Sequence, residues 1–108
     1  MTINNSNFKI FFTNEFIKEM DYIYNYISKN LYSKNSAKKL MKKVEDHIEH
    51  LKFMPKSYAI IKEIEEINLE YRRIVIDNYS ILYTISESKN TIYVVHMYYN
   101  ASDYLNKI

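Results

Sequence analysis

The sequence contains no cysteine, no glycine and no tryptophan, and it has a single proline among its 108 residues. The lack of cysteine excludes disulfide bonds and thiol nucleophiles, and it fits a reducing cytosol. The lack of glycine excludes Gly-rich phosphate-binding loops. Turns that need a positive φ must therefore use Asn or Asp, and the sequence offers Asp77-Asn78 and Lys89-Asn90 for them.

Long apolar runs and a strong net charge are also missing. No stretch approaches the roughly 18 consecutive apolar residues of a membrane-spanning helix, and no basic segment followed by an apolar one stands at the N-terminus. We therefore expect a cytoplasmic protein with neither a membrane span nor a signal peptide. The formal net charge of +2 is too small to imply a nucleic-acid partner. We expect one domain over residues 1–108, frayed over residues 1–6.

The first half of the chain carries a strand pattern and then two helix patterns. Apolar residues alternate over residues 8–12, and Thr13 follows as an expected helix cap. Steps of three and four then predict a helix with the apolar stripe Phe16, Met20, Ile23, Ile27 and Leu31. The pattern breaks, and Ser33 or Ser36 is the expected cap of a second helix. Pro55 ends this helix, whose stripe is Ala37, Leu40, Met41, Val44, Ile48 and Leu51.

The other face of the second helix is rich in lysine. Its positions are Lys34, Lys38, Lys39, Lys42 and Lys43. A lysine face on a helix is usually solvated surface, and the alternative is a track for phosphates or for an acidic partner.

The second half of the chain carries three clear strand patterns. Residues 57–69 have no clean period, and we interpret them as mostly loop. Residues 71–76 and 79–85 alternate on either side of Asp77-Asn78, and residues 91–99 are apolar on both faces, which places them inside a sheet. The expected fold is α+β: an N-terminal strand, an antiparallel helical hairpin and a three-stranded antiparallel meander. The helices cover one face of the small sheet, and the other face is expected to be open and concave.

An ordered set of residues resembles the RelE/ParE superfamily of bacterial toxins. An N-terminal strand comes first, and the hairpin that follows it ends with Leu51-Lys-Phe-Met-Pro55. The next part of the set is Arg72-Arg-Ile-Val-Ile-Asp-Asn-Tyr-Ser-Ile-Leu-Tyr83. The pattern closes with Ile92-Tyr-Val-Val-His-Met-Tyr-Tyr99 and Asp103-Tyr104. The resemblance covers nearly the whole chain, from Phe8 to Leu105. Its most specific part is the order of Arg, alternating aliphatics, Asn-Tyr, aliphatics and Tyr.

The resemblance implies the toxin of a type II toxin–antitoxin module, of the kind that stabilises plasmids, bound by a cognate antitoxin in a hetero-oligomer. It implies growth arrest by ribosome-dependent mRNA cleavage, as in the RelE-like mRNA interferases, which need no metal or cofactor. The alternative is ParE-like inhibition of DNA gyrase by a protein that is not an enzyme. Many members end the last strand with two arginines, where this chain has Ala101 and Ser102. A further alternative is therefore an attenuated, non-toxic member that still binds its antitoxin.

Candidate site residues follow from the chemistry of RNA cleavage. The reaction needs a cation for the phosphate and an acid or base, and we assign these roles to Arg72 and His96. The other interpretations are an arginine paired with Glu70 and a buried structural histidine. Arg72 and Arg73 point to opposite faces of their strand, so only one of them can line a given site. Candidates for nucleic-acid or target binding are Arg73, Tyr79, Tyr98, Tyr99 and Tyr104.

Overall fold

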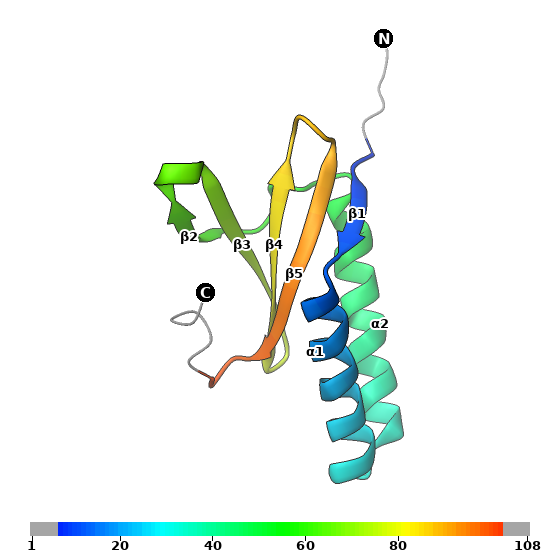
Figure 1. Cartoon of the computed structure of the whole chain (residues 1–108). Helices are drawn as coiled ribbons and strands as arrows, with labels where there is room; N and C mark the ends of the chain where they lie inside the picture. Colours follow the sequence, from blue (N-terminus) through cyan, green and yellow to red (C-terminus); the bar gives the residue numbers. More distant parts are fainter. Residues whose placement is uncertain (1–6, 103–108) are drawn as a thin grey trace.

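The computed structural model describes residues 7–102. Its order is β1 (Lys9–Phe12), α1 (Asn14–Asn25), a π-helical turn η1 (Tyr26–Asn30), α2 (Lys34–Leu51), β2 (Ile60–Ile64), a 3₁₀ turn η2 (Glu65–Ile67), β3 (Leu69–Ile76), β4 (Tyr79–Ser86) and β5 (Thr91–Tyr99). The five strands form one sheet in the order β1-β5-β4-β3-β2, with α1 and α2 packed beside it (Figure 1). Strand β1 pairs parallel to β5, and every other pair is antiparallel.

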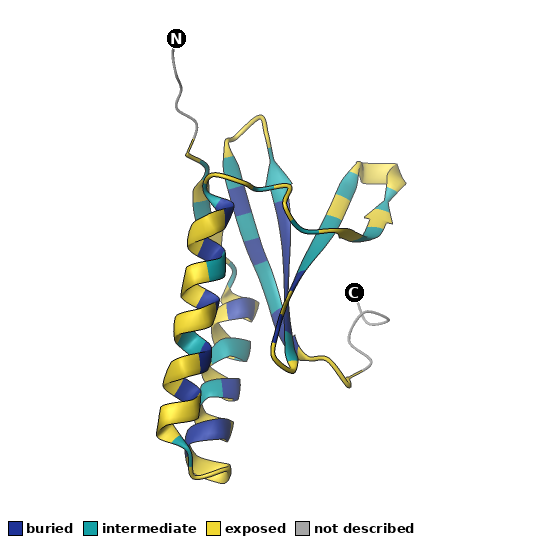
Figure 2. Cartoon of the chain, turned by 180° about the vertical axis from the view of Figure 1, so that it is seen from behind, coloured by how far each residue is buried: buried dark blue, intermediate teal, exposed yellow. Residues whose placement is uncertain are grey.

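The helical hairpin forms as its sequence predicts, except that Leu31 of the first predicted stripe lies beyond η1 and is exposed. The Thr13 hydroxyl accepts a hydrogen bond from the Phe16 N–H, and the Ser33 hydroxyl accepts one from the Ser36 N–H. Each bond satisfies a donor that the first helical turn leaves unpaired. The buried positions of the helices face inward and their outer faces are exposed (Figure 2). Both helices therefore bury one apolar stripe each.

The hydrophobic core joins these stripes to one face of the sheet. Helix residues of the core are Phe16, Ile23, Ile27, Ala37, Leu40, Val44, Ile48 and Leu51, and strand residues are Ile74, Ile76, Ile81, Tyr83, Ile92, Val94 and Met97. The strand residues recur at every second position, except at a β-bulge in β5. The α+β fold with helices on one face of the sheet is confirmed.

Two expectations about the sheet are wrong. Residues 57–69 are not mostly loop, because Ile60–Ile64 forms β2 and adds a fourth strand to the meander. A register shift between Ile60 and Lys62 breaks the alternation of this edge strand, which hides its period. The face away from the helices is not open over β4 either, because Ser80 and Leu82 are fully buried there. In the register, Ser80 lies between Val75 and Tyr98, and Leu82 lies between Arg73 and His96.

Positive φ angles fall where a chain without glycine can best accept them. Asp77 (φ 54°) and Asn90 (φ 52°) lie in the two expected hairpin turns. Asn68 (φ 52°) ends η2 before β3. Tyr32 (φ 52°) at the tip of the helical hairpin is the exception, because an aromatic residue is strained in this region.

Candidate functional site

Arg72 is bound to the segment that joins α2 to β2. It points toward the helix side of β3, and its side chain is only 12% exposed. Its Nη1 donates to the carbonyl of Tyr58 at 2.7 Å and to that of Lys56 at 3.5 Å. The Glu70 carboxylate lies 3.9 Å from Nη2 of Arg72. This is the ion pair that the sequence allows as the alternative to a phosphate-binding role for Arg72. The guanidinium therefore has several donors committed to its own chain.

Two tyrosines and a histidine hold the same segment. Tyr83 is fully buried, and its hydroxyl donates to the Pro55 carbonyl at 2.6 Å. The His47 Nδ1 lies 2.6 Å from the Tyr58 hydroxyl, and the Tyr58 and Tyr83 rings meet edge to face. Burial raises the pKa of Tyr83 to about 12, although the positive charge of Arg72 opposes this shift. Together with Arg72, these contacts fix the path of the chain after α2.

His96 lies beside α1. Its Nδ1 is 3.2 Å from Oε1 of Glu19, and the Met97 N–H donates to the same oxygen at 3.0 Å. The pairing of Leu82 with His96 and of Tyr83 with Val94 leaves Val95 as the extra residue of a β-bulge. The bulge breaks the strand alternation that groups His96 with Val94 in the sequence, and Met97 takes the core-facing position instead.

Arg72 and His96 are not brought together. Arg72 pairs with Tyr83, which pairs with Val94, whereas His96 pairs with Leu82. The two candidate catalytic residues are therefore two strands apart, roughly 10 Å across the sheet. Tyr83 and Leu82 are neighbours on β4 and point to opposite faces, so Arg72 and His96 belong to opposite faces as well.

Arg73 and His96 lie opposite the same residue of β4. Arg73 pairs with Leu82, which in turn pairs with His96. The Arg73 guanidinium makes no hydrogen bond or ion pair with the part of the chain that the structure describes. Arg73 and His96 thus flank Leu82 from either side, and the His96 ring reaches Glu19 of α1.

Four tyrosines surround a cleft of about 600 Å³, which we name the tyrosine cleft. It lies between the end of the helical hairpin, the β3–β4 turn and the end of β5, and its lining is Tyr22, Ile23, Tyr26, Leu31, Asn78, Tyr79 and Tyr99. The Tyr22 and Tyr26 rings are stacked at 6.4 Å, and those of Tyr79 and Tyr99 meet edge to face at 5.8 Å. Burial raises the pKa of Tyr79, and the phenols of Tyr99 and Tyr26 raise it further.

The tyrosine cleft contains two of the tyrosines that the sequence selects and two that it does not. Tyr79 and Tyr99 are among the predicted target-binding residues, whereas Tyr22 and Tyr26 are not. Their spacing of four residues, beside the apolar stripe, was the available signal. Of the remaining candidates, Tyr98 is buried and Tyr104 lies outside the described residues.

The end of β5 carries no basic side chain at Ala101 and Ser102, which are both exposed. The Ser102 N–H and hydroxyl both donate to the Tyr99 carbonyl and turn the chain. The cation that many members of the superfamily place after this strand is thus not supplied by these two positions.

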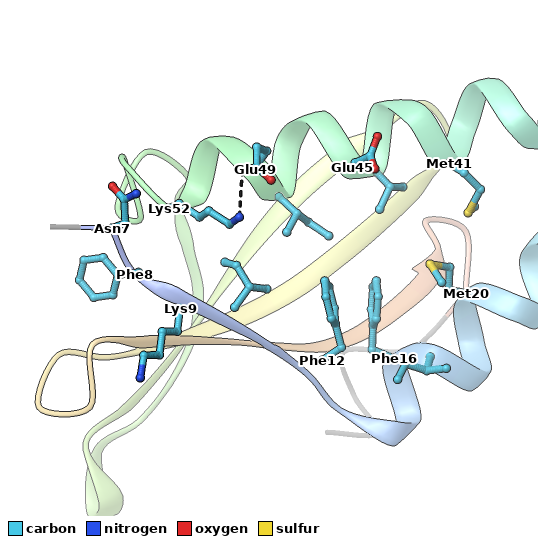
Figure 3. Close-up of a pocket in the computed structure, with 14 residues that line it drawn as sticks. Asn7, Phe8, Lys9, Phe12, Phe16, Met20, Met41, Glu45, Glu49 and Lys52 are labelled. Carbon is cyan, nitrogen blue, oxygen red and sulfur yellow. Dashed lines mark ion pairs between the residues drawn. The ribbon is translucent and has the colours of Figure 1, made fainter. Parts of the chain in front are cut away.

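An apolar groove of about 900 Å³, which we name the hairpin groove, runs between β1 and the two helices (Figure 3). Phe12 and Phe16 stack at 5.5 Å on one side of it. Its rim is charged, because Lys9, Glu45, Glu49 and Lys52 surround the apolar floor, and Lys52 pairs with Glu49 at 2.9 Å. The floor and rim fit a segment with one apolar face.

Two further features are absent from the described part of the chain. None of its helices is long and apolar enough to cross a membrane. Residues 7–102 bring no three His, Asp or Glu side chains into an arrangement that could hold a metal ion.

Comparisons with known proteins give a family. The model of the family described as "ParE toxin of type II toxin-antitoxin system, parDE" matches residues 10–104. A solved structure titled "Chromosomal ParDE TA system from P. aeruginosa" has a similar fold, with a TM-score of 0.68 at 12% identity. The match covers 88% of this chain and 98% of that one. No curated protein sequence matches the chain. Since the family model spans nearly all of the sequence, the chain belongs to the ParE toxin family of type II toxin–antitoxin systems.

Proposed function

We propose that this protein arrests growth by binding DNA gyrase, in the manner implied for ParE-like toxins, and that it does not cut RNA. The observation that carries the proposal is the separation of Arg72 from His96 on opposite faces of the sheet. The family match supports the toxin assignment, and the cognate antitoxin is its implied partner.

The side chains support binding better than RNA cleavage. Cleavage needs a cation on the phosphate and an acid or base within hydrogen-bond reach of the same reacting group. Arg72 already donates to two backbone carbonyls, and His96 faces the Glu19 carboxylate. Ala101 and Ser102 add no cation. A nuclease built on Arg72 and His96 would have to rearrange the segment after α2.

The tyrosine cleft is the surface that we assign to the target protein. Tyrosine is over-represented among the residues that dominate protein–protein binding, because its ring buries a large area at little entropic cost. Tyr22 is 71% exposed and Tyr99 is 51% exposed, so both rings are available to a partner. Among residues 7–102, no charged side chain lines the cleft.

The hairpin groove is the surface that we assign to the antitoxin. A helix with an apolar face fits a groove with an apolar floor, and residues at the edges of such a helix meet a charged rim. Within the described part of the chain, the groove and the tyrosine cleft share no lining residue. A toxin–antitoxin hetero-oligomer can therefore form without filling the cleft directly.

The test is a supercoiling assay with purified gyrase. Wild-type protein should inhibit supercoiling, and Tyr22→Ala combined with Tyr99→Ala should weaken inhibition at least tenfold, which corresponds to about 1.4 kcal/mol. Tyr32→Ala is the matched control, since Tyr32 is a tyrosine that is 91% exposed and lies outside the cleft. Gyrase that keeps full activity at saturating wild-type protein would reject the proposal.

One observation favours mRNA cleavage as a second candidate function. Arg73 and His96 flank Leu82 on one face, and Arg73 has its guanidinium available. In this case induced expression yields transcripts cut at defined codon positions, and Arg73→Ala abolishes the cuts while Arg72→Ala destabilises the fold. Intact transcripts in arrested cells exclude this candidate, and unimpaired growth points to a non-toxic member.

A further inference from the structure

The lysines of α2 are gathered in its first half. Residues 34–43 contain five lysines and no acidic residue, whereas residues 44–51 contain three acidic residues and no lysine. All five lysines are exposed. The first turn of α2 contains no acidic residue either. Positive charges near a helix N-terminus oppose the helix dipole, so this arrangement is unfavourable for the helix itself.

The five lysines divide into two groups by their partners. Lys42 pairs with Glu45 and Asp46, and Lys43 pairs with Asp77 at 3.0 Å. The hydrogen bond to Asp46 raises the pKa of Lys42. The other group is Lys34, Lys38 and Lys39, for which no ion pair is found within residues 7–102. We name these three residues the unpaired lysines.

We infer that the unpaired lysines bind the phosphate backbone of duplex DNA, and that they contact the DNA that gyrase holds when the toxin binds to it. The DNA part of the inference stands on the charge distribution of α2. Its link to gyrase rests on the proposed function.

The residues between the unpaired lysines favour a polyanion over other acidic partners. Between Lys34 and Lys39 the other exposed positions are Asn35 and Ser36, so no exposed aromatic or aliphatic side chain lies between the unpaired lysines. Protein interfaces derive most of their affinity from a few buried anchors, above all Trp, Tyr and Arg, and not from lysine. Binding to an anionic membrane surface likewise needs an apolar face that enters the lipid. A surface that offers charge alone fits a regular array of phosphates, where binding comes from the release of counterions.

The unpaired lysines and the tyrosine cleft lie on different elements. The lysines stand on the outer face of α2, whereas the tyrosines come from α1, η1, β4 and β5. Lys34 and Lys38 are one helical turn apart, about 6 Å along the axis of α2. The protein can thus hold a protein partner and a DNA segment at the same time.

The experiment measures binding of the full chain to a fluorescent 30-base-pair duplex, a length of about 100 Å, in the absence of gyrase. We expect non-specific binding with a Kd of about 10⁻⁴ to 10⁻⁶ M, and three phosphate contacts give a slope of log K against log salt of about −2.7. The affinity should then fall about 40-fold when the salt concentration rises from about 50 to about 200 mM.

Matched double variants separate local contacts from net charge. Lys38→Gln with Lys39→Gln should reduce the slope by about 1.8, because two phosphate contacts are lost. Lys42→Gln with Lys43→Gln changes the net charge equally but removes paired lysines, so its slope should stay near that of wild type. Equal loss in both variants, or no salt-dependent binding by the wild type, overturns the inference.

Two further arms identify the partner. Anionic phospholipid vesicles and poly-glutamate should compete with the duplex poorly, and competition at equal charge concentration overturns the assignment to DNA. Failure of the wild type to inhibit gyrase counts against the proposed function, whereas failure to bind the duplex counts against this inference alone. If both hold, the Lys38 and Lys39 double variant should also inhibit gyrase several-fold less than the Lys42 and Lys43 control.

Discussion

Replacing Tyr83 by phenylalanine should loosen the segment that follows α2. The substitution keeps the buried ring and deletes the hydroxyl that donates to the Pro55 carbonyl at 2.6 Å. A lost hydrogen bond with an unsatisfied acceptor costs about 1–2 kcal/mol in the free energy of unfolding. With a urea m-value of about 1.5 kcal/mol per M, the unfolding midpoint should fall by about 1 M. Tyr93→Phe, at a half-buried tyrosine without such a bond, is the control and should shift it little.

The pH dependence of the same pair of proteins tests the burial of Tyr83. Its pKa in the folded protein is about 12, above the value of about 10 expected for the unfolded chain. The neutral hydroxyl therefore contributes its full stability below pH 10, and that contribution is lost as the pH rises through about 12. Over this window the stability advantage of wild type over Tyr83→Phe should vanish and then reverse, because a pKa difference of about two units corresponds to roughly 3 kcal/mol. An advantage that is constant from pH 8 to pH 12, or a midpoint unchanged at neutral pH, would refute the reasoning.

Three other predictions concern single contacts. Thr13→Ala removes the cap of α1 and the bond from its hydroxyl to the Val95 carbonyl, so unfolding in urea should show a loss of about 1–2 kcal/mol, whereas Thr13→Ser should retain most of it. Glu19→Ala leaves the Met97 N–H without its acceptor and should cost about 1–3 kcal/mol, with the amide of Met97 exchanging its hydrogen faster. Tyr32→Gly relieves a positive φ and should raise stability by about 0.5–1 kcal/mol by the same denaturation measurement, and a loss of stability would contradict the strain.

The sequence predicts the elements whose causes are local. Thr13 and Ser33 cap helices because their hydroxyls reach an N–H three residues ahead, and this chemistry is readable from the residue order alone. The two apolar stripes and the hairpin turn at Asp77-Asn78 are local in the same sense. For these elements, sequence and structure agree.

Features that depend on distant pairing could not be predicted in this way. Strand β2 is recognisable only through its register with β3, since a shift after Ile60 disturbs its alternation. The bonds of Arg72 run to backbone carbonyls, which every residue has, so no residue type signals them. The tyrosine cleft is formed by residues of α1, η1, β4 and β5. The sequence selects its strand residues Tyr79 and Tyr99 as target-binding candidates, but it does not select Tyr22 and Tyr26.

The parallel pairing of β1 with β5 has a consequence for the order of folding. Thr13, at the end of β1, bonds to Val95, a residue 82 positions later in the chain. Contacts between residues this far apart in the sequence form late in folding, because closing the long loop between them costs entropy. Since β1 forms one wall of the hairpin groove, the groove should be absent from chains that end before Thr91. Protease protection of Phe8 to Phe12 in truncated chains would contradict this order. A nascent toxin would then lack the groove that we assign to the antitoxin until its last strand had left the ribosome.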